Sequence, residues 1–297
     1  MKELVVVSGK GGVGKSTITA SLSVLLSKTG IGITAIDSDV DAPNLSIILG
    51  VDIVDYIDIQ ASEKASIDPA KCVKCGKCLS VCKTGALINI EGEVPTVISF
   101  LCEGCGSCAL ICPTEAISIR RVTNGRIGIA KTYYGFPIVT GQLNIGESNS
   151  GYIVTAVKAK GRAVAEDSGS DLILVDGPPG IGCPVIASIA GADYALVVTE
   201  PTPAARNSLN RILSVLAHFK IPAIAVINKF DLNPNYADEM ENWLQAKWAI
   251  PIAGKIPSDE NVPISLSNRI PVVEYNPNCE TSKALLILSN RILREVQ

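Results

Sequence analysis

Residues 4–17 read LVVVSGKGGVGKST, and this stretch sets the expected fold of the chain. Its apolar start has the length and β-branched composition of a buried strand. The glycine-rich part from Gly9 to Ser16 matches the phosphate-loop pattern Gly-x4-Gly-Lys-Ser. A helical pattern then runs through Leu26 to a second strand-like run, ITAID, at residues 33–37. Strand, glycine loop, helix and strand in this order predict the opening βαβ unit of an α/β domain.

Three further apolar runs extend this pattern along the chain, namely LILVD at 172–176, ALVVT at 195–199 and AIAVIN at 223–228. Each run is followed by a helical segment. Near-continuous apolar strands that alternate with helices indicate a parallel sheet covered on both faces. We therefore predict an α/β fold, with a doubly wound, mostly parallel P-loop NTPase sheet formed by residues 1–60 and 122–297.

The segment between these two parts, residues 61–121, is rich in cysteine and internally duplicated. Eight of the ten cysteines form two runs with the same C-x2-C-x2-C-x3-C spacing, and the runs start thirty residues apart. The first run contains Cys72, Cys75, Cys78 and Cys82, and the second contains Cys102, Cys105, Cys108 and Cys112. Pro113 follows the second run, whereas Lys83 follows the first. The spacing is similar to that of bacterial two-cluster ferredoxins, so we expect an inserted small α+β ferredoxin-like domain.

The spacing also predicts how the thiolates are shared. Three cysteines of one run can reach three corners of one [4Fe-4S] cube, whereas the fourth is directed at the other cube. We therefore expect cluster 1 to be held by Cys72, Cys75, Cys78 and Cys112, and cluster 2 by Cys82, Cys102, Cys105 and Cys108. The alternatives are a disulfide framework and a pair of zinc sites. Zinc does not require the third and fourth cysteines in this register, which favours the iron-sulfur interpretation.

The composition is that of a globular protein in a reducing compartment. The chain has 297 residues, 47% of them hydrophobic, which is enough to fill a sizeable core. A net charge of -3 gives no general attraction for nucleic acid or for an anionic membrane, so neither is expected as a partner. No secretory leader precedes the first strand, and no apolar run reaches the ~18 residues that span a bilayer. We therefore expect a cytoplasmic protein whose cysteines serve metal ligation rather than disulfides.

The phosphate loop lies directly between a strand and a helix, which is the context in which this motif binds a nucleotide. Its backbone N–H groups would wrap the phosphates at the positive end of the helix. Lys15 would pair with the β- and γ-phosphates, and the Ser16 hydroxyl would hold Mg²⁺. The predicted phosphate-binding residues are Gly11, Gly12, Val13, Gly14, Lys15, Ser16 and Thr17.

Lys10 adds a second lysine, and the run from Lys10 to Thr17 resembles the deviant Walker A motif of the MinD/ParA/Mrp and nitrogenase iron protein family. In that family the early lysine reaches the partner's phosphates in a nucleotide-sandwich dimer, so the resemblance implies that Lys10 acts in trans. Asp39, after the second strand, falls where the family's switch I aspartate orients the attacking water. Asp176, which precedes Gly-Pro-Pro-Gly, resembles the Walker B acid that binds Mg²⁺ through water. The alternative for both acids is a helix cap.

Two weaker motifs point to the base of the nucleotide. Asn228, in the sequence Asn-Lys-x-Asp after a strand, resembles the purine-reading motif of nucleotide-binding proteins and would face the base. Pro257 and Asp259 fall where relatives close the adenine pocket through backbone contacts, although the segment also fits an ordinary turn. The implied cofactors are ATP or ADP, Mg²⁺ and two [4Fe-4S] clusters.

The combination resembles MinD-superfamily ATPases with an inserted ferredoxin domain. It implies an ATPase, slow without a partner, that forms a homodimer, or a heterodimer with a paralogous ATPase, on ATP binding. Nucleotide state would control electron transfer or the docking of a redox, iron-sulfur or molybdenum-cofactor-related partner. An iron-sulfur scaffold or carrier is the alternative, but the Cys-x-x-Cys pair that Mrp-type carriers use at the dimer seam is absent outside the two runs. A ParA/MinD-like positioning ATPase is disfavoured by the acidic charge.

Two features stay open at this point. Cys183 and Cys279 lie outside both runs; each fits a buried thiol, and Cys183 also fits a group that meets its counterpart across a dimer. Residues 141–151 alternate small and polar residues, so they form either a partner loop or a plain connection.

Overall fold

The computed structural model describes residues 1–90, 92–147 and 150–296. The chain divides into two compact units. Unit 1 consists of Met1–Tyr56, Ile127–Gln142 and Ser150–Gln297, and unit 2 consists of Ile57–Arg126 and Leu143–Asn149. The cysteine-rich segment 61–121 lies within unit 2. The chain therefore contributes to unit 2 twice, once with the cysteine runs and once with a short return segment directly before a helix of unit 1.

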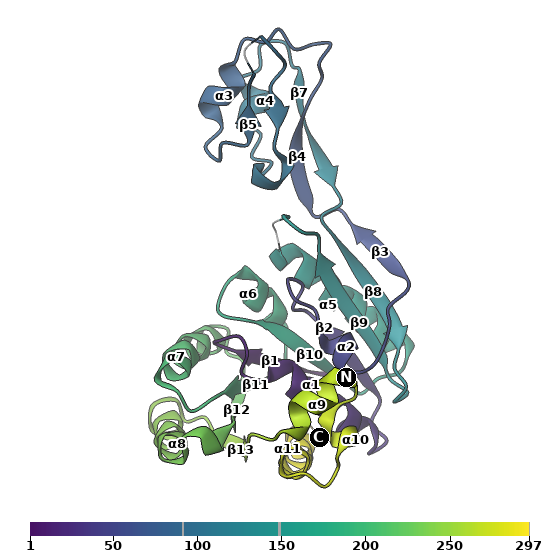
Figure 1. Cartoon of the computed structure of the whole chain (residues 1–297), viewed down its shortest axis with the longest axis vertical. Helices are drawn as coiled ribbons and strands as arrows, with labels where there is room; N and C mark the ends of the chain where they lie inside the picture. The colour runs from purple at the N-terminus through teal and green to yellow at the C-terminus, as the bar shows by residue number, and fades with distance from the viewer. Residues whose placement is uncertain (91, 148–149, 297) are drawn as a thin grey trace. The chain divides into compact units, whose positions relative to one another are not determined.

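The main sheet has nine strands in the described part of the chain, in the order β13-β12-β11-β1-β10-β2-β9-β8-β3 (Figure 1). The pairs along it from β13 to β9 are all parallel. This confirms the predicted α/β class with a large, mostly parallel sheet. The strands are β1 (Lys2–Ser8), β2 (Ile33–Asp37), β3 (Tyr56–Ile59), β8 (Gly125–Lys131), β9 (Pro137–Leu143), β10 (Leu172–Pro179), β11 (Tyr194–Thr199), β12 (Ala223–Asn228) and β13 (Ile252–Ile256).

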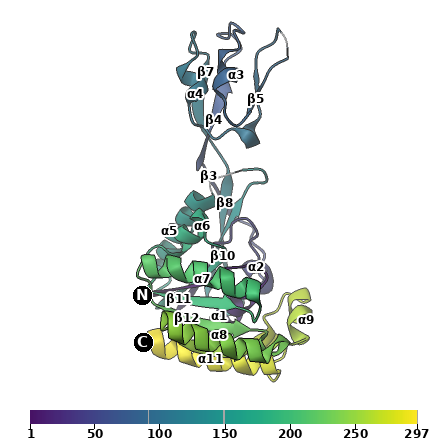
Figure 2. The ribbon, with the colours of Figure 1, turned by 90° about the vertical axis from the view of Figure 1, so that its left-hand side faces the viewer.

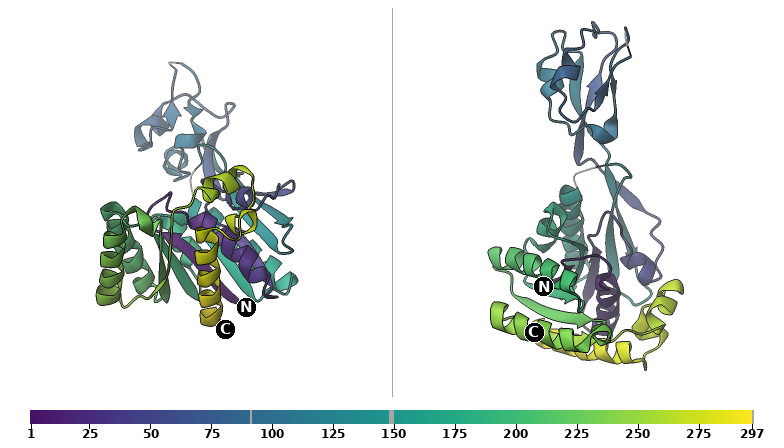
Figure 3. Two further views of the ribbon diagram at one scale, coloured as in Figure 1. Left: turned by 60° about the horizontal axis from the view of Figure 1, so that its bottom comes forward. Right: turned by 60° about the vertical axis from the view of Figure 1, so that its left-hand side comes forward.

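Helices cover both faces of this sheet (Figures 1 and 3). The chain runs β1-α1-β2 in one direction along the sheet and β10-α6-β11-α7-β12-α8-β13 in the other. Because crossovers between parallel strands are right-handed, opposite directions place their helices on opposite faces. Helix α1 therefore shares one face with α11, whereas α5, α6, α7 and α8 cover the other (Figure 2).

The helices of unit 1 are α1 (Lys15–Ser27), α2 (Leu45–Ile48), α5 (Ser150–Asp167), α6 (Cys183–Ile189), α7 (Pro203–His218), α8 (Pro234–Trp248), α9 (Asn261–Ser267), α10 (Val272–Tyr275) and α11 (Glu280–Val296), with a 3₁₀ turn η2 at Phe230–Leu232. In the described residues, no helix is both long enough and apolar enough to span a membrane.

The two elements that flank the phosphate loop, β1 and α1, are both packed in the core of unit 1. Val5, Val6 and Val7 in β1 are fully buried, as expected for a strand that is covered on both faces. In α1, Ile18 and Leu22 are buried against the same sheet. A rigid strand before the loop and a packed helix after it leave the loop itself little freedom to move.

Unit 2 repeats one small pattern, as its duplicated sequence suggests. Each cysteine run passes through a glycine in the left-handed conformation, Gly76 or Gly106, into a short helix. Strand β4 pairs with β7, and β5 with β6, in both cases antiparallel. Ala65, Leu87 and Ile117 are buried together in its small core. Its elements are β4 (Ser62–Ile67), α3 (Lys77–Val81), β5 (Leu87–Ile88), β6 (Thr96–Val97), η1 (Ser99–Leu101), α4 (Ser107–Leu110) and β7 (Ile117–Val122).

Residues 141–151 do not form a single loop. Strand β9 extends to Leu143, and α5 begins at Ser150. Between these elements, Glu147 donates its backbone N–H to Asn144 O over 3.0 Å. The expectation of a partner loop also covered residues 148–149, which lie outside the described residues.

Gly161 tests how closely α5 packs on the sheet. A Cβ at this position would lie 2.2 Å from Ile36 Cδ1 in β2. Alanine normally stabilises a helix interior by about 0.5–1 kcal/mol relative to glycine, but overpacking a filled core costs about 1–3 kcal/mol. We therefore expect Gly161→Ala to lower the free energy of unfolding, measured by urea denaturation, by about 1–2 kcal/mol.

Ile36→Val, which shortens the obstructing side chain, is the matched background for this test. The double variant should lose less stability than the sum of the two single losses, because the two sites are in contact. A Gly161→Ala protein as stable as the parent would show that α5 is not packed this closely.

Candidate functional site

The phosphate loop lies between β1 and α1 and lines a cavity of about 410 Å³. Gly14 has a φ of 92° and forms the N-terminal cap of α1. Only glycine fits here, since a Cβ would lie 2.3 Å from the amide nitrogen of Asn228. The predicted residues that line the cavity are Gly11, Gly12, Gly14, Lys15, Ser16, Thr17 and Asp39. Val13 is instead buried in the apolar core.

A buried ion pair joins the loop to β10. Lys15, only 7% exposed, donates to Asp176 Oδ1 over 3.1 Å, and its Nζ lies 4.0 Å from Asp39 Oδ2. Thr19 Oγ1 also donates to Asp176 Oδ1, over 3.1 Å. The second oxygen, Asp176 Oδ2, is buried and has no hydrogen-bond partner among the described residues. An acceptor left open in this way suits a water molecule bound to a magnesium ion.

The site holds more negative than positive charge. Burial, reinforced by the Asp176 carboxylate, raises the pKa of Asp37 to about 8. Burial also raises the pKa of Asp39 to about 6, although Lys15 acts in the opposite direction. For Lys15, burial alone lowers the pKa, but the attraction of Asp176 and Asp39 outweighs it and the pKa is raised. A divalent cation beside the phosphates would relieve the repulsion between the Asp39 and Asp176 carboxylates, so the charge pattern fits Mg²⁺.

A capping role falls to a different aspartate from the two that the sequence singled out. Asp37 accepts two backbone N–H groups at the start of α2, including that of Asn44 over 2.9 Å. The N-terminal cap residues are Asn44 for α2 and Gly182 for α6, rather than Asp39 or Asp176. Asp37 thus fixes the backbone that follows β2, and with it the position of Asp39.

Lys10 forms an ion pair within its own chain. Its Nζ donates to Glu200 Oε1 over 2.8 Å, and Lys229 Nζ lies 4.0 Å from the other oxygen of this carboxylate. Lys229 also donates to Gly12 O over 3.2 Å. Glu200 is only 8% exposed, whereas the Lys10 side chain is 46% exposed. Sequence reasoning missed Glu200, although it follows a buried strand at the same edge of the sheet as Asp176.

A second cavity, of about 270 Å³, adjoins the loop. Its lining includes Asn228, Pro257 and Asp259, the residues predicted to meet the base. The Asn228 amide donates to Val13 O over 2.8 Å, which ties the loop to β12. Asp231, the last residue of the Asn-Lys-x-Asp motif, accepts the Ser258 N–H over 2.6 Å. The Asp259 carboxylate accepts the N–H of Asn261 over 2.9 Å, within its own loop.

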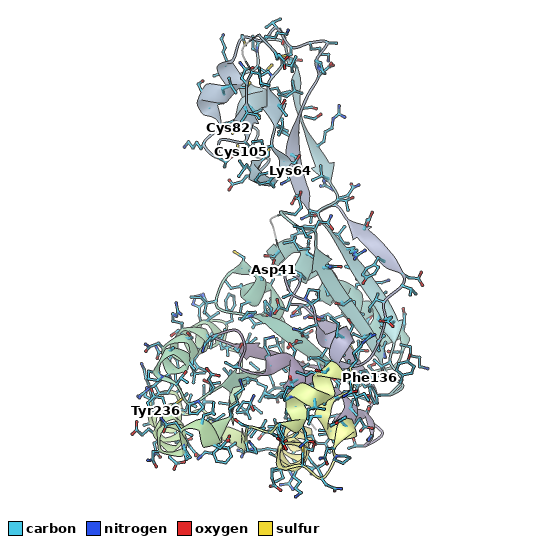
Figure 4. The ribbon with its side chains drawn as sticks, viewed as in Figure 1. Asp41, Lys64, Cys82, Cys105, Phe136 and Tyr236 are labelled. Atoms are coloured by element: carbon cyan, nitrogen blue, oxygen red, sulfur yellow. The ribbon has the colours of Figure 1, made fainter. Side chains whose placement is uncertain are left out.

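The eight cysteines of the two runs line two separate cavities in unit 2. The first is lined by Cys72, Cys75, Cys78 and Cys112, and the second by Cys82, Cys102, Cys105 and Cys108. The two quartets have the same membership as the ligand sets expected from the spacing. Figure 4 labels Cys82 and Cys105, which come from different runs and line one cavity. Among the described residues, no group of three or more His, Cys, Asp or Glu side chains is arranged to hold a single metal ion.

Backbone N–H groups are directed at sulfurs of both quartets. Ala65 donates to Cys102 Sγ over 3.4 Å, and Ala116 donates to Cys112 Sγ over 3.2 Å. Hydrogen bonds, first among them that from the Thr114 N–H, lower the pKa of Cys112. These contacts favour the thiolate, which is the form of cysteine that ligates metals.

The two remaining cysteines do not line either cavity. Cys279 is buried, as expected for a structural thiol. Cys183 is exposed at the first residue of α6, so the expectation of a buried thiol is wrong for this residue.

Comparison with known proteins agrees with the architecture of unit 1. The family model of the CobQ/CobB/MinD/ParA nucleotide binding domain matches residues 4–272. The chain belongs to this family. The matched range includes most of unit 1 and all of unit 2.

Two uncharacterized proteins of Methanocaldococcus jannaschii are similar over most of their length. One is 35% identical over 280 residues, which cover 94% of this chain and 93% of the relative. The other is 31% identical over 239 residues, which cover 78% of this chain and 83% of the relative.

Among solved structures, the septum site-determining protein MinD of Pyrococcus horikoshii, complexed with Mg-ADP, has a TM-score of 0.63. It is 20% identical in sequence, and the match covers 98% of this chain and 95% of the MinD chain. The fold is therefore MinD-like.

The raised pKa values predict how stability depends on pH. Asp37 and Asp39 hold protons in the folded protein at pH values where the same groups, with an ordinary pKa of 3.8, have lost them in the unfolded chain. Their contribution to the free energy of unfolding is therefore largest below about pH 4 and is lost as the pH rises to about 8. Asp39→Asn should remove the contribution of Asp39, which lies between about pH 4 and 6, and leave that of Asp37, so the decrease in this range becomes shallower.

Urea denaturation between pH 4 and 8, without Mg²⁺ or nucleotide, measures this contribution. Asp55→Asn, at an exposed position outside the site, is the control and should leave the profile unchanged. An Asp39→Asn profile that runs parallel to that of the parent would contradict the raised pKa.

Proposed function

We propose that this protein is an ATPase whose nucleotide state controls electron transfer through two [4Fe-4S] clusters, or the docking of a redox or metal-cofactor-assembly partner. The observation that carries the proposal is the division of eight cysteines into two crossed quartets, each around its own cavity, on a chain of a nucleotide-binding family. Neither feature requires the other. Their presence in one polypeptide favours a function that couples them.

The phosphate loop and its carboxylates support the binding and hydrolysis of ATP with Mg²⁺. Lys15 would pair with the β- and γ-phosphates once nucleotide enters, and Ser16 would hold the ion. The open oxygen of Asp176 would accept a hydrogen bond from a water on that ion. Asp39 would orient the attacking water. Because phosphoryl transfer depends mainly on positioning and charge neutralisation, no separate general base is required, and hydrolysis would be slow without a partner.

The second cavity, which Asn228, Pro257 and Asp259 line, would hold the base of the nucleotide. The MinD relative of known structure was complexed with Mg-ADP, which supports an adenine nucleotide here.

Lys10 would act in trans in an ATP-bound dimer. To reach a second molecule it has to leave Glu200, and releasing a half-exposed lysine costs little, about 1 kcal/mol or less. Lys229, 4.0 Å from the same carboxylate, remains to neutralise it. The dimer would be a homodimer or a heterodimer with a paralogous ATPase. The presence of two relatives in M. jannaschii supports the second arrangement.

The cysteine spacing favours iron-sulfur clusters over zinc. Zinc does not require the third and fourth cysteines in this register, whereas two-cluster ferredoxins have them. A [4Fe-4S] cluster, which would supply one-electron redox chemistry, binds each thiolate through a different iron, so that its ligands stand further apart. The chain would supply the eight thiolates, and the N–H groups of Ala65 and Ala116 would stabilise their negative charge.

Two other functions are each favoured by one observation. Cys75 and Cys105 are exposed, which suits a scaffold or carrier that hands clusters to other proteins. Clusters that move to an apoprotein acceptor, instead of surviving turnover, would identify that role. The name of the structural relative, septum site-determining protein MinD, suits a positioning ATPase. Binding of this protein to DNA or to lipid vesicles only in the presence of ATP would identify that role.

Crossed ligation is tested by comparing pairs of cysteine variants. Anaerobically prepared protein should contain about eight iron and eight sulfide per chain. Cys112→Ser and Cys75→Ser should lose the same cluster, because both residues line the first cavity. The two variants should therefore give the same EPR spectrum in the reduced state, and Cys82→Ser and Cys105→Ser should share a different one.

Cys279→Ser, outside both quartets, should retain both signals and the full iron content. A spectrum of Cys112→Ser that matches Cys105→Ser would mean that the ligation is not crossed. A parent protein without inorganic sulfide would remove the iron-sulfur half of the proposal.

The two lysines of the phosphate loop should have separable effects. Lys15→Ala should abolish nucleotide binding in isothermal titration calorimetry, because it removes the phosphate ligand and leaves Asp176 buried without its partner. Lys10→Ala should bind ATP as the parent does but fail to dimerise in sedimentation experiments, and its hydrolysis should fall by at least about tenfold. A Lys10→Ala protein that hydrolyses ATP at the parental rate excludes the role in trans.

A further inference from the structure

A buried ion pair lies beside the second cysteine cavity without lining it. Lys64, in β4, is 4% exposed, and its Nζ lies 3.1 Å from Glu147 Oε2 (Lys64 is labelled in Figure 4). The same Nζ donates to Ser99 O over 2.8 Å. In the described residues, Glu147 Oε2 makes no hydrogen bond of regular geometry, so the carboxylate depends on the charge of Lys64. Removing the Lys64 charge and most of the Glu147 carboxylate from water is costly, which calls for a role beyond surface solvation.

The backbone connects Lys64 to Cys102 from two directions. Ser99 begins the turn η1, which leads directly into Cys102. Ala65, the residue after Lys64, lines the second cavity and donates its N–H to Cys102 Sγ over 3.4 Å. The lysine charge is therefore fixed close to the second quartet.

We propose that the Lys64–Glu147 pair sets the reduction potential of the cluster held by the second quartet. This inference rests on the proposed presence of that cluster. Reduction adds one electron, taken from an external one-electron donor, and so adds one negative charge without breaking a bond. A fixed positive charge nearby favours the reduced state, and a fixed negative charge opposes it. Lys64 therefore raises the potential, and Glu147 lowers it.

We expect this potential to depend on nucleotide state as well, because Glu147 is close in the sequence to a helix of unit 1. Glu147 lies on the return segment of unit 2, three residues before α5 begins at Ser150. Within unit 1, a Cβ on Gly151 at the start of α5 would lie only 3.2 Å from Cys183 Cβ in α6. Helix α6 follows the glycine-rich segment after Asp176. A movement of that segment with nucleotide state would thus reach the base of the segment that carries Glu147.

Two variants that remove charges of opposite sign test this inference. The measurement is an EPR-monitored redox titration of the full, cluster-containing chain. Glu147→Gln should make the second-quartet cluster easier to reduce, and Lys64→Met should make it harder. Each should change the ratio of reduced to oxidised cluster at a fixed potential by about tenfold, which is about 59 mV for one electron. Lys64→Arg, which keeps the charge, should keep the parental potential. Shifts of the same sign in Glu147→Gln and Lys64→Met would indicate general loosening and overturn the inference.

Glu63→Gln is the matched control on the same strand. Its partner Arg121 is 4.0 Å away and both side chains are exposed, so solvent should screen the change and leave the potential near the parental value. Unchanged potentials in Glu147→Gln and Lys64→Met proteins with full iron content overturn the inference but leave the proposed function intact. A parent without clusters would overturn both.

The nucleotide link has its own readout in the same titration. The parent should show different potentials for this cluster with ADP and with a non-hydrolysable ATP analogue. The difference should disappear in Glu147→Gln. Equal potentials in the parent, or a difference that survives in Glu147→Gln, would overturn the link.

Discussion

The contact between Lys15 and Asp176 is the constraint on which the nucleotide half of the molecule depends. Strands β1 and β10 are parallel neighbours with Val6 opposite Asp176, so the loop after β1 emerges beside that carboxylate. Both charges are almost fully buried, and removing either partner of such a pair typically costs about 3–5 kcal/mol. Asp39 adds a further negative charge to the same place near neutral pH, whereas the raised pKa of Asp37 keeps that group mostly protonated. The folded site thus holds repulsion between Asp39 and Asp176 that a divalent cation would relieve, so it is built for its ligand at some expense to its own stability.

The topology explains how a second unit can be added to such a site without disturbing it. Strands β9, β8 and β3 are consecutive in the sheet order, and three of the four boundaries between the two units fall within these strands. These three crossing points of the chain are therefore neighbours at one edge of the sheet. An insertion with closely spaced ends costs little in chain entropy and leaves the central strands intact.

Sequence reasoning succeeded where the signal is local. The strand, loop and helix around Lys15 are encoded by adjacent residues, and the grouping of the cysteines around two cavities follows from spacings of two and three residues. It failed where the partner is distant in the sequence. Lys10 pairs with Glu200, 190 positions away, and no pattern marks which of many glutamates will lie beside a given lysine.

Burial was also hard to read from the phosphate-loop motif. Val13 belongs to the motif, but its side chain packs in the core and its backbone oxygen accepts the Asn228 amide. Asp37 and Asp39 look alike in the sequence, two residues apart, yet the first is fully buried and accepts backbone N–H groups of α2 while the second lines the cavity. Only the turn between β2 and α2 distinguishes them. The place of Glu147 in unit 2 likewise depends on a return segment whose alternation of small and polar residues does not indicate which unit it joins.

The coupling free energy that these ion pairs can supply between the nucleotide site and the clusters limits how far ATP could change a cluster potential. Lys10–Glu200 and Lys64–Glu147 are both lysine–glutamate pairs in which one partner is close to a segment expected to respond to nucleotide. Coupling between sites in proteins typically amounts to about 1–3 kcal/mol, and a tenfold change in a one-electron equilibrium, about 1.4 kcal/mol, corresponds to about 59 mV. Rearranged counter-charges would therefore move a cluster potential by roughly 40–130 mV. A shift of this size decides whether electrons pass to a partner of similar potential, but it does not drive reduction of a partner several hundred millivolts lower. Nucleotide hydrolysis in this chain would then act as a gate on electron flow or partner docking rather than as its source of driving force.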